Sequence, residues 1–464
     1  MADKEKKVLK KKIIACRELR VLPAKRSIES LSAQELDGKR VLVRVDFNVP
    51  LVRGQISDDT RIRAALLTIN YLLENGAKVV LVSHLGRPNG KVNTKFSLKP
   101  VAKRLGELLG QKVPKLEGRI SVEVKAQIEK MPEARIVLLE NIRFDPREES
   151  TDSDRAELAR ELAALADFYV NDAFGAAHRA HASTEGVARL LKKTTYAGFL
   201  MRSEMDILNK ALVRLTQREE ELKNLVLLEG EKAQPGHSVV AMVAGAKVSS
   251  KIGVLKALLG KVDILIIAGM MSLTFSAAKE AGKGGILDDI TEKDLDAARE
   301  FLGKKTITKV VFPVDNVVFT DVERSGKTPA ERFKPGLAEK LSKIVSSSEI
   351  GKEEEGVDIG RDTIRLFTSI INEANTVIWN GPVGVFEDTR FAKGTKAIAK
   401  AVAESEALVI VGGGDSLSAI EQAEVSDLFT PERTKFLSTG GGAMLEYIEN
   451  NGKLPGIDVI PDQD

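Results

Sequence analysis

Several short apolar runs in this chain end abruptly in glycine, an acid, histidine or arginine. The runs are Val41–Val45, Val79–Val82, Ile136–Leu139, Val377–Trp379 and Leu408–Val411. Runs that are apolar throughout and rich in Val, Ile and Leu are typical of parallel strands covered by helices on both faces. In open α/β sheets, ligands bind beyond the carboxyl ends of the strands. The polar residues that follow the runs are therefore expected to form an active site.

Length and composition limit the class of protein. At 464 residues the chain is too long for one ordinary core, so two domains are expected. Hydrophobic residues make up 43% and the net charge is only +3, so any anion site must come from local clustering. Cys16 is the only cysteine, which excludes an intrachain disulfide and favours a reducing compartment, the cytoplasm or an organelle. No apolar stretch approaches the roughly 20 residues that span a bilayer, so no membrane contact is expected.

Strand-like runs alternate with helical patterns in both halves of the chain. In the second half the runs are Val240–Val243, Ile264–Ile267, Val310–Val314, Val377–Trp379, Leu408–Val411 and Phe436–Leu437. This alternation predicts two Rossmann-like, three-layer α/β domains with mainly parallel sheets, joined by a helical hinge. We expect the first domain at residues 27–202, the hinge helix and an excursion at 203–237, and the second domain at 238–445. Residues 1–26 form a lysine-rich extension, and the sequence does not decide its role.

Positive charge gathers at the expected strand ends of the first half. The residues concerned are Arg44, Arg61, Arg63, Arg87, Arg143, Arg179, His84, His178 and His181. A guanidinium presents a planar fork that suits phosphate and carboxylate, so a cluster of them predicts a small-anion site. Asp46 and Asn48 follow the first run and either accept from a ligand hydroxyl or orient an arginine. Aromatic residues make up only 5%, and no basic face with interleaved aromatics occurs, so nucleic acid is not the expected partner.

The second half carries glycine turns that suit a nucleotide. Neither G-x-x-x-x-G-K-[ST] nor G-x-G-x-x-G occurs, so a standard P-loop and a dinucleotide site are not expected. Instead, Gly412–Ser416 lies between a strand and a helical run, where backbone amides can approach phosphate. Asp415 is a candidate ligand for Mg²⁺, and Glu387 a candidate acceptor for ribose hydroxyls. Lys247 and Lys251 are four residues apart, so we expect both to project from one helical face.

Longer motifs show a resemblance to a known family. They are RVDFNVP from Arg44, SHLGRP from Ser83, LLENIRF from Leu138, NDAFGAAHRAHAS from Asn171, AKVSSKI from Ala246, WNGPVGVFE from Trp379, GGGDS from Gly412 and STGGGA from Ser438. With these motifs in this order, the chain resembles phosphoglycerate kinase from about Lys39 to its C-terminus.

The resemblance implies reversible transfer of the acyl phosphate of 1,3-bisphosphoglycerate to Mg-ADP, giving 3-phosphoglycerate and ATP, by a monomer whose domains close. By motif position, phosphoglycerate would be bound by Asp46, Phe47, Asn48, Arg61, His84, Leu85, Gly86, Arg87, Arg143 and Arg179. Nucleotide would be bound by Lys247, Lys251, Gly269, Gly356, Glu387, Gly413, Gly414, Asp415 and Ser416, with Asp415 at the metal. Catalytic roles would fall to Arg61, Lys247, Gly413 and Gly414. Residues 446–464 would pack back on the first, phosphoglycerate-binding domain, and residues 238–445 would bind nucleotide.

The chain departs from the family pattern at four positions. Ala244 replaces a glycine and Ser250 an aspartate in the motif around Lys247, while Ala268 and Met270 replace two members of a glycine triplet. These changes fall around the wall expected to face the adenine base, so the sequence leaves the nucleotide preference open.

Two other functions compete with the kinase. One is a non-catalytic relative that binds phosphoglycerate or nucleotide and acts in regulation, and the other is a nucleic-acid binder that uses the lysine-rich extension. Because Arg61, Lys247 and Asp415 are all present, the sequence favours the enzyme.

Overall fold

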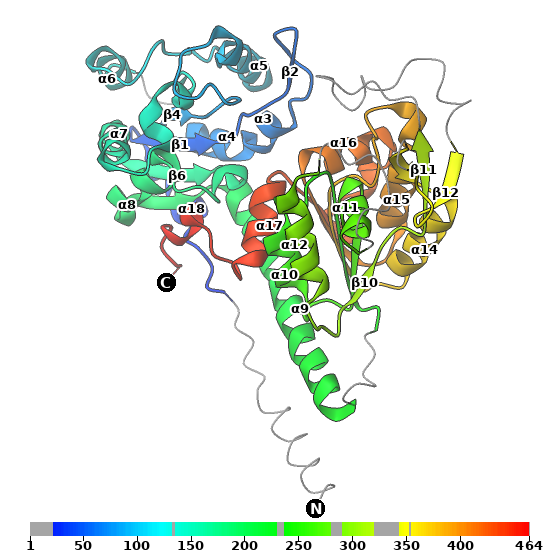
Figure 1. The fold of residues 1–464 in the computed structure, drawn as a ribbon. Helices are drawn as coiled ribbons and strands as arrows, with labels where there is room; N and C mark the ends of the chain where they lie inside the picture. Colours follow the sequence, from blue (N-terminus) through cyan, green and yellow to red (C-terminus); the bar gives the residue numbers. More distant parts are fainter. Residues whose placement is uncertain are drawn as a thin grey trace, which may run out of the picture.

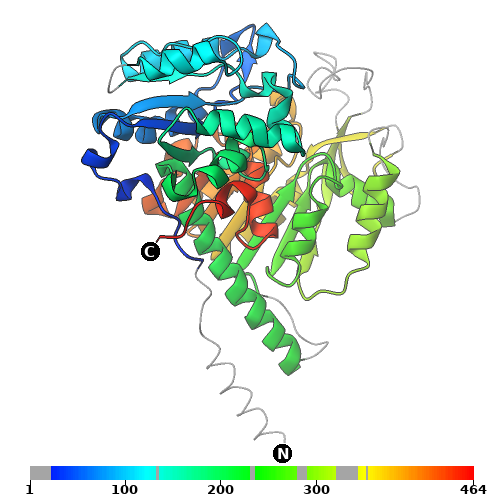
Figure 2. The same cartoon turned by 90° about the vertical axis from the view of Figure 1, so that its left-hand side faces the viewer.

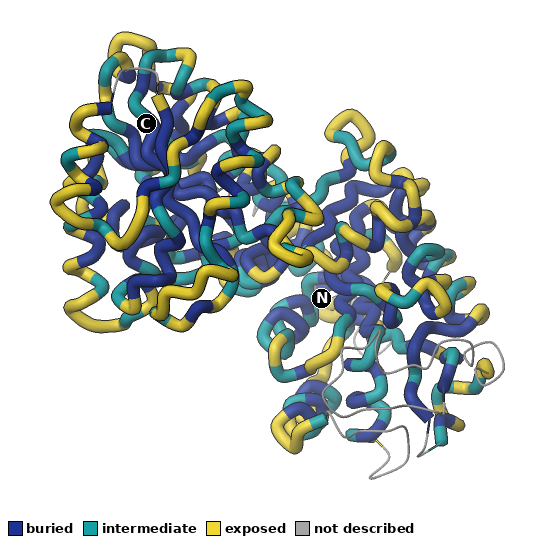
Figure 3. The backbone as a smooth tube through the Cα atoms, turned by 90° about the horizontal axis from the view of Figure 1, so that it is seen from above, coloured by how far each residue is buried: buried dark blue, intermediate teal, exposed yellow. Residues whose placement is uncertain are grey.

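The computed structural model describes residues 22–131, 135–229, 236–279, 290–319, 343–351 and 354–463. Figure 1 shows two α/β lobes, with the long helix α9 (Phe199–Glu229) beginning at the first lobe and continuing along the second. Seen from above in Figure 3, the buried residues concentrate inside each lobe. Most of the expected N-terminal extension lies outside the described residues. None of the helices in the described ranges is both long and apolar enough to cross a membrane.

The first lobe is built on a five-stranded parallel sheet. Its spatial order is β5 (Ile136–Leu138), β4 (Lys78–Val82), β1 (Arg40–Val45), β6 (Phe168–Asp172) and β7 (Thr195–Ala197). Its helices are α2 (Ala33–Leu36), α3 (Thr60–Ala64), α4 (Leu66–Glu74), α5 (Lys99–Leu109), α6 (Val122–Glu129), α7 (Ser153–Ala163) and α8 (Val187–Leu190), and a hairpin joins β2 (Leu51–Val52) to β3 (Gln55–Ile56).

Both faces of this sheet are buried, which explains the unbroken apolar runs. Val41 and Val43 of β1 pack in one hydrophobic cluster, and Leu42 between them packs in another on the opposite face. Successive side chains of a strand point to opposite faces, so a strand covered on both sides must be apolar at every position. The expected strands of the first half are therefore found almost residue for residue.

The second lobe repeats this architecture with six parallel strands. Their order is β10 (Lys309–Val311), β9 (Ile264–Ala268), β8 (Val239–Ala244), β14 (Thr376–Asn380), β15 (Leu408–Gly412) and β16 (Lys435–Ser438). The helices here are α10 (Ile252–Leu258), α11 (Met270–Lys279), α12 (Glu292–Leu302), α14 (Arg361–Asn372), α15 (Lys393–Glu404), α16 (Gly414–Gln422) and α17 (Gly441–Glu449).

One expected strand of this lobe is wrong. The run Val310–Val314 is not continuous, because β10 ends at Val311 and the next strand begins at Asp315. Pro313 lies between them, and proline cannot donate to a strand ladder. The second segment belongs to a separate antiparallel sheet, in the order β12 (Lys343–Ser346), β11 (Asp315–Phe319) and β13 (Glu355–Ile359).

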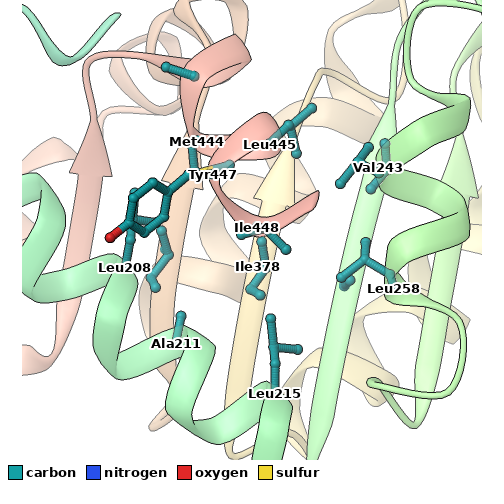
Figure 4. Close-up of a cluster of buried hydrophobic side chains, with 14 of the residues drawn as sticks. Leu208, Ala211, Leu215, Val243, Leu258, Ile378, Met444, Leu445, Tyr447 and Ile448 are labelled. Carbon is teal, nitrogen blue, oxygen red and sulfur yellow. The ribbon is translucent and has the colours of Figure 1, made fainter. Parts of the chain in front are cut away.

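Helix α9 and helix α17 join the two lobes through one hydrophobic cluster. Figure 4 shows this cluster at the second sheet, with α9, α17 and the strands converging on it. The labelled members are Leu208, Ala211, Leu215, Val243, Leu258, Ile378, Met444, Leu445, Tyr447 and Ile448. The same cluster contains Phe174 and Ala197 from the first lobe. Of the expected hinge and excursion at residues 203–237, residues 203–229 belong to helix α9, which starts at Phe199, and residues 230–235 lie outside the described residues.

The end of the chain returns to the first lobe, as Figures 1 and 2 both show in red. In α18 (Pro455–Asp458), the Gly456 amide donates to the Ala177 carbonyl at 2.8 Å, and Asn171 Nδ2 donates to the Gly456 carbonyl at 2.9 Å. Lys25 pairs with Asp462 at 2.8 Å. These contacts anchor the last residues beside β6.

Candidate active site

A cavity of about 230 Å³ opens at the carboxyl ends of the first-lobe strands. Its lining residues are Asp46, Asn48, Arg61, His84, Gly86, Arg87, Arg143, Gly175, Ala176, His178, Arg179 and Gly440–Gly442. The loops after β1, β4 and β6 supply most of this wall, because parallel strands bring their carboxyl ends to the same edge. The last three glycines come from the second lobe, so the cavity lies between the lobes.

Asp46 anchors the charge pattern of this cavity. Its Oδ2 lies 3.6 Å from Arg61 Nη1, and its Oδ1 accepts from the Asn48 amide at 3.2 Å. Burial opposes the charge of Asp46, but the Arg61 and Arg44 guanidinium groups outweigh it and lower the pKa of the carboxyl. Arg61 also donates from Nη1 to the Asn48 carbonyl at 2.9 Å. Asp46 is therefore an anionic residue that helps to orient Arg61.

The positive charge of the cavity resides on guanidinium groups and not on imidazoles. Arg143 is buried and donates from Nη1 to the Gly86 carbonyl at 2.9 Å. Arg179 donates from Nε to His178 Nε2 at 3.0 Å, which requires His178 to be an acceptor there. Burial, with Arg179 beside it, lowers the pKa of His178 to about 4. The cavity keeps its charge across neutral pH because guanidinium does not titrate.

The structure separates the predicted substrate residues into two groups. Eight of the ten line the cavity, whereas Phe47 and Leu85 are buried in the hydrophobic core beneath it. Gly175 and Ala176 also line the cavity although the sequence assigned them no contact, and both lie inside the motif from Asn171. His178, which the sequence placed in the positive cluster, lines it too. Gly440–Gly442 was expected on the nucleotide side, and only the packing of the lobes places it here.

A second cavity, of about 380 Å³, lies at the carboxyl ends of the second-lobe strands. Its lining residues are Gly245, Ala246, Lys247, Gly269, Met270, Leu273, Ile290, Asn316, Glu355, Gly356, Val357, Asp358, Pro382–Val385, Glu387 and Asp415. The wall is apolar over α11, while Lys247 and Asp415 bring opposite charges to it. An apolar group could pack against α11 on this wall, and an anionic group could pair with Lys247.

The two lysines after β8 do not share a helical face, contrary to the sequence prediction. Helix α10 begins only at Ile252, and the residues before it form turns. Lys247 is exposed on the cavity wall, whereas Lys251 turns inward and donates to the Ala244 carbonyl and to Asn380 Oδ1, the latter at 2.7 Å. Burial lowers the pKa of Lys251 to about 8, although Asp415 acts in the opposite direction. Lys251 is therefore placed to support the strand ends beneath the cavity.

The glycine turn after β15 begins α16. Gly413 has φ +110°, a conformation that L side chains rarely adopt, and Asp415 is exposed in the first turn of the helix. Ser416 is buried, and its Oγ accepts from the Gly381 amide at 2.7 Å, so its side chain holds the loop after β14 in place. Of the predicted Gly413–Ser416 group, only Asp415 lines the nucleotide-side cavity.

Asp358 is a cavity residue that no sequence signal indicated. It accepts from the Gly394 amide at 2.6 Å and from its neighbour Ile359 at 2.9 Å. Burial raises its pKa to about 7. Asp358 lies in β13, so its burial depends on the antiparallel sheet.

The glycine turns that precede α16 and α17 connect the walls of the two cavities, because Gly440–Gly442 line the first and Asp415, in the first turn of α16, lines the second. A methyl group on Gly441 would lie 2.3 Å from Gly413 Cα, and one on Gly440 would lie 2.7 Å from Gly175 Cα in the first lobe. Arg61 Nη2 donates across the same junction to the Thr439 carbonyl at 3.3 Å. Backbone therefore meets backbone here, at the N-termini of α16 and α17.

The chain is similar to known proteins over most of its length. A model of the phosphoglycerate kinase family matches residues 31–451. The cytosolic phosphoglycerate kinase of Nicotiana tabacum is 44% identical over 447 residues, which cover 95% of this chain and 100% of that relative. The chain belongs to the phosphoglycerate kinase family.

Further relatives agree with this assignment. The chloroplastic phosphoglycerate kinase 1 of Arabidopsis thaliana is 46% identical, over 94% of this chain and 82% of that one. The solved structure of phosphoglycerate kinase from Coxiella burnetii superposes with a TM-score of 0.69 at 36% identity, and it covers 94% of this chain and 98% of that one. Relatives thus include both cytosolic and chloroplastic phosphoglycerate kinases, and the two-lobed α/β fold is that of a phosphoglycerate kinase.

The residues at which the chain departs from the family pattern do not share one environment. Ala244 is fully buried at the end of β8, and its carbonyl accepts from Lys251. Ser250 is exposed, and its hydroxyl donates to the Lys247 carbonyl at 2.8 Å. Ala268 is fully buried in β9, so of the four only Met270 lines the nucleotide-side cavity. Of the four residues, Met270 is therefore the one placed to contact a ligand in this cavity.

Proposed function

We propose that the chain binds 1,3-bisphosphoglycerate in the first-lobe cavity and Mg-ADP in the second-lobe cavity, and transfers the acyl phosphate between them. The contact between Gly413 and Gly441 carries this proposal, because it joins the turn before Asp415, which lines the second cavity, to the glycines that line the first. Phosphoryl transfer needs little covalent help from protein and depends mostly on positioning and charge neutralisation. Reversal of the same step gives ATP consumption and 1,3-bisphosphoglycerate formation.

The residue roles follow from position and charge. Arg87, Arg143 and Arg179 are the donors for the anionic ends of phosphoglycerate, and Asn48 with Asp46 faces its hydroxyl. Arg61, already directed toward the interlobe junction by the Thr439 carbonyl, and Lys247, on the opposite wall, flank the migrating phosphoryl group. The helix starts at Gly414 and Gly441 add their backbone amides to the phosphate path.

Asp415 fits a shared magnesium site. It is an exposed hard oxygen ligand on the cavity wall, and no group of three acidic, histidine or cysteine side chains within the described ranges could hold a metal alone. Mg²⁺ is usually held by one or two carboxylates together with nucleotide phosphates, so one carboxylate suffices. The ion would neutralise phosphate charge. Asp415 itself would orient the nucleotide through it.

We infer the domain assignment that the sequence suggested: residues 27–202 bind phosphoglycerate, residues 446–464 pack back on that domain, and residues 238–445 bind nucleotide. Closure of the two lobes would exclude water from the acyl phosphate, which otherwise hydrolyses. We also infer a monomer in the cytoplasm, which sedimentation velocity and cell fractionation would test.

A coupled assay tests the function directly. ATP formation from 1,3-bisphosphoglycerate should be rapid with ADP, and the same assay with GDP and IDP measures the nucleotide preference. Arg61→Ala and Lys247→Ala should each lower kcat far more than they weaken ground-state binding. Arg63→Ala on α3 and Lys256→Ala on α10 are matched controls, because neither side chain borders a cavity. Absence of ATP formation, with both substrates bound, would instead identify a non-catalytic relative.

A further inference from the structure

A row of buried polar side chains lies directly behind the phosphoglycerate cavity. Arg44 is 1% exposed, Ser183 and Glu148 are 0% exposed, and His84 is 6% exposed. Of these four, only His84 borders the cavity. The other three come from β1 and from the loops after β5 and β6, so they form a support that substrate does not reach.

Hydrogen bonds hold Arg44 in one position. Its Nε donates to Ser183 Oγ at 2.8 Å, and its Nη1 donates to the Val45 carbonyl. Ser183 is fixed in turn by Glu148, whose Oε1 and Oε2 lie 2.6 Å from the Ser183 hydroxyl and 2.9 Å from its amide. A guanidinium with its Nε and Nη1 groups occupied in this way directs Nη2 to a single neighbour.

That neighbour is the His84 ring. Arg44 Nη2 lies 3.1 Å from His84 Nδ1. Guanidinium nitrogens only donate, so Nδ1 must carry a lone pair and the proton of the neutral ring must be on Nε2. Asp46 would favour the opposite tautomer, but its Oδ1 is 3.8 Å from Nδ1, beyond hydrogen-bond range. Burial and the surrounding arginines also lower the pKa of His84 well below its ordinary value, which keeps the ring neutral.

We propose that Arg44 is a positioning residue that fixes His84 as the Nε2–H tautomer and so makes it a neutral hydrogen-bond donor to an oxygen of phosphoglycerate. Within the described residues Nε2 has no hydrogen-bond partner, and the ring borders the cavity. The part of this proposal that concerns substrate rests on the proposed function. The tautomer of His84 does not rest on the proposed function, because it follows from the hydrogen bond with Arg44.

The first measurement is the tautomer in the full-length chain labelled with ¹⁵N. Long-range ¹H–¹⁵N spectra distinguish protonated from unprotonated ring nitrogens, and His84→Gln identifies the signals of this ring among the four histidines. The expected result is a protonated Nε2 and an unprotonated Nδ1 at neutral pH. A protonated Nδ1 would overturn the proposal, whether or not the chain is active.

The second measurement compares Arg44→Met, which removes the donor, with Arg44→Lys, which keeps one. Arg44→Met should raise KM for 3-phosphoglycerate roughly three- to tenfold, the worth of about one neutral hydrogen bond, and leave KM for ATP unchanged. Arg44→Lys should retain the Nε2–H tautomer and most of the affinity. Equal affinity and equal tautomer in Arg44→Met and the parent would refute the role. If Arg44→Met does not fold, the tautomer of His84 in the parent chain and in Arg44→Lys still tests the proposal. If the parent chain shows the expected tautomer but forms no ATP, only the kinase assignment is rejected.

Discussion

The junction between the two cavities makes a sharp prediction about adjacent glycines of α17. A methyl group on Gly441 would lie 2.3 Å from Gly413 Cα, 2.4 Å from Gly413 N and 3.0 Å from the Gly412 carbonyl carbon. These are backbone atoms, so no side chain can rotate to relieve the overlap. Around Gly442, one residue further along the same helix, nothing lies within 4 Å. Gly441→Ala and Gly442→Ala therefore form a matched pair that differs mainly in this overlap.

The magnitude follows from two opposing effects. Overpacking costs about 1–3 kcal/mol, and alanine in a helix gains at most about 1 kcal/mol over glycine. Gly441→Ala should therefore be destabilised by up to about 2 kcal/mol, while Gly442→Ala should be unchanged or stabilised by up to about 1 kcal/mol. For a domain of this size about 2 kcal/mol between the variants corresponds to roughly 4–8 °C in Tm.

Calorimetry of the full-length chain measures this difference directly. The kcat of Gly441→Ala should also fall, because the displaced turn carries the Thr439 carbonyl that accepts from Arg61. Equal Tm values for the two alanine variants would refute the reasoning, since they would show that the turns separate without cost.

Three further results are expected from buried or metal-facing groups. Burial raises the pKa of Asp358 to about 7, so the folded chain keeps a proton that the unfolded chain loses near pH 4. The free energy of unfolding should therefore fall as the pH rises from about 4 to 7. In urea titrations at several pH values, Asp358→Asn should flatten that fall. Lys251→Met leaves two carbonyl oxygens without their donor and should lower the free energy of unfolding by about 1–3 kcal/mol, whereas Lys256→Met on the helix surface should not. Asp415→Ala should weaken Mg-nucleotide binding in calorimetric titrations; an unaltered magnesium dependence would contradict its metal role.

Much of the fold could be predicted because both sheets are covered on two faces. Val79–Val82 and Leu408–Val411 are apolar at every position for that reason, and their ends mark the strand ends closely. The antiparallel sheet around β11 escaped prediction because its strands mix polar with apolar residues, and two of them begin at Asp315 and Glu355. Asp358 was missed with it.

Side-chain direction at the site was the least predictable feature. Spacing alone put Lys247 and Lys251 on one helical face, yet the chain there turns before α10 begins, and one lysine points outward while the other is buried. Phe47 and Leu85 belong to the motifs but face the core. Sequence position shows which loop a residue occupies, whereas the backbone angles of that loop decide where its side chain points.

The order of the strands along the chain, the residue types at their ends and the family were all determined by local sequence, because periodicity and motif spacing are local properties. The connection between the walls of the two cavities was not determined by local sequence. It depends on α9 and α17 packing in one cluster that spans both lobes and on glycine backbones meeting at Gly413 and Gly441. Contacts between residues far apart in the chain are decided by packing and shape, and these exist only in the folded molecule.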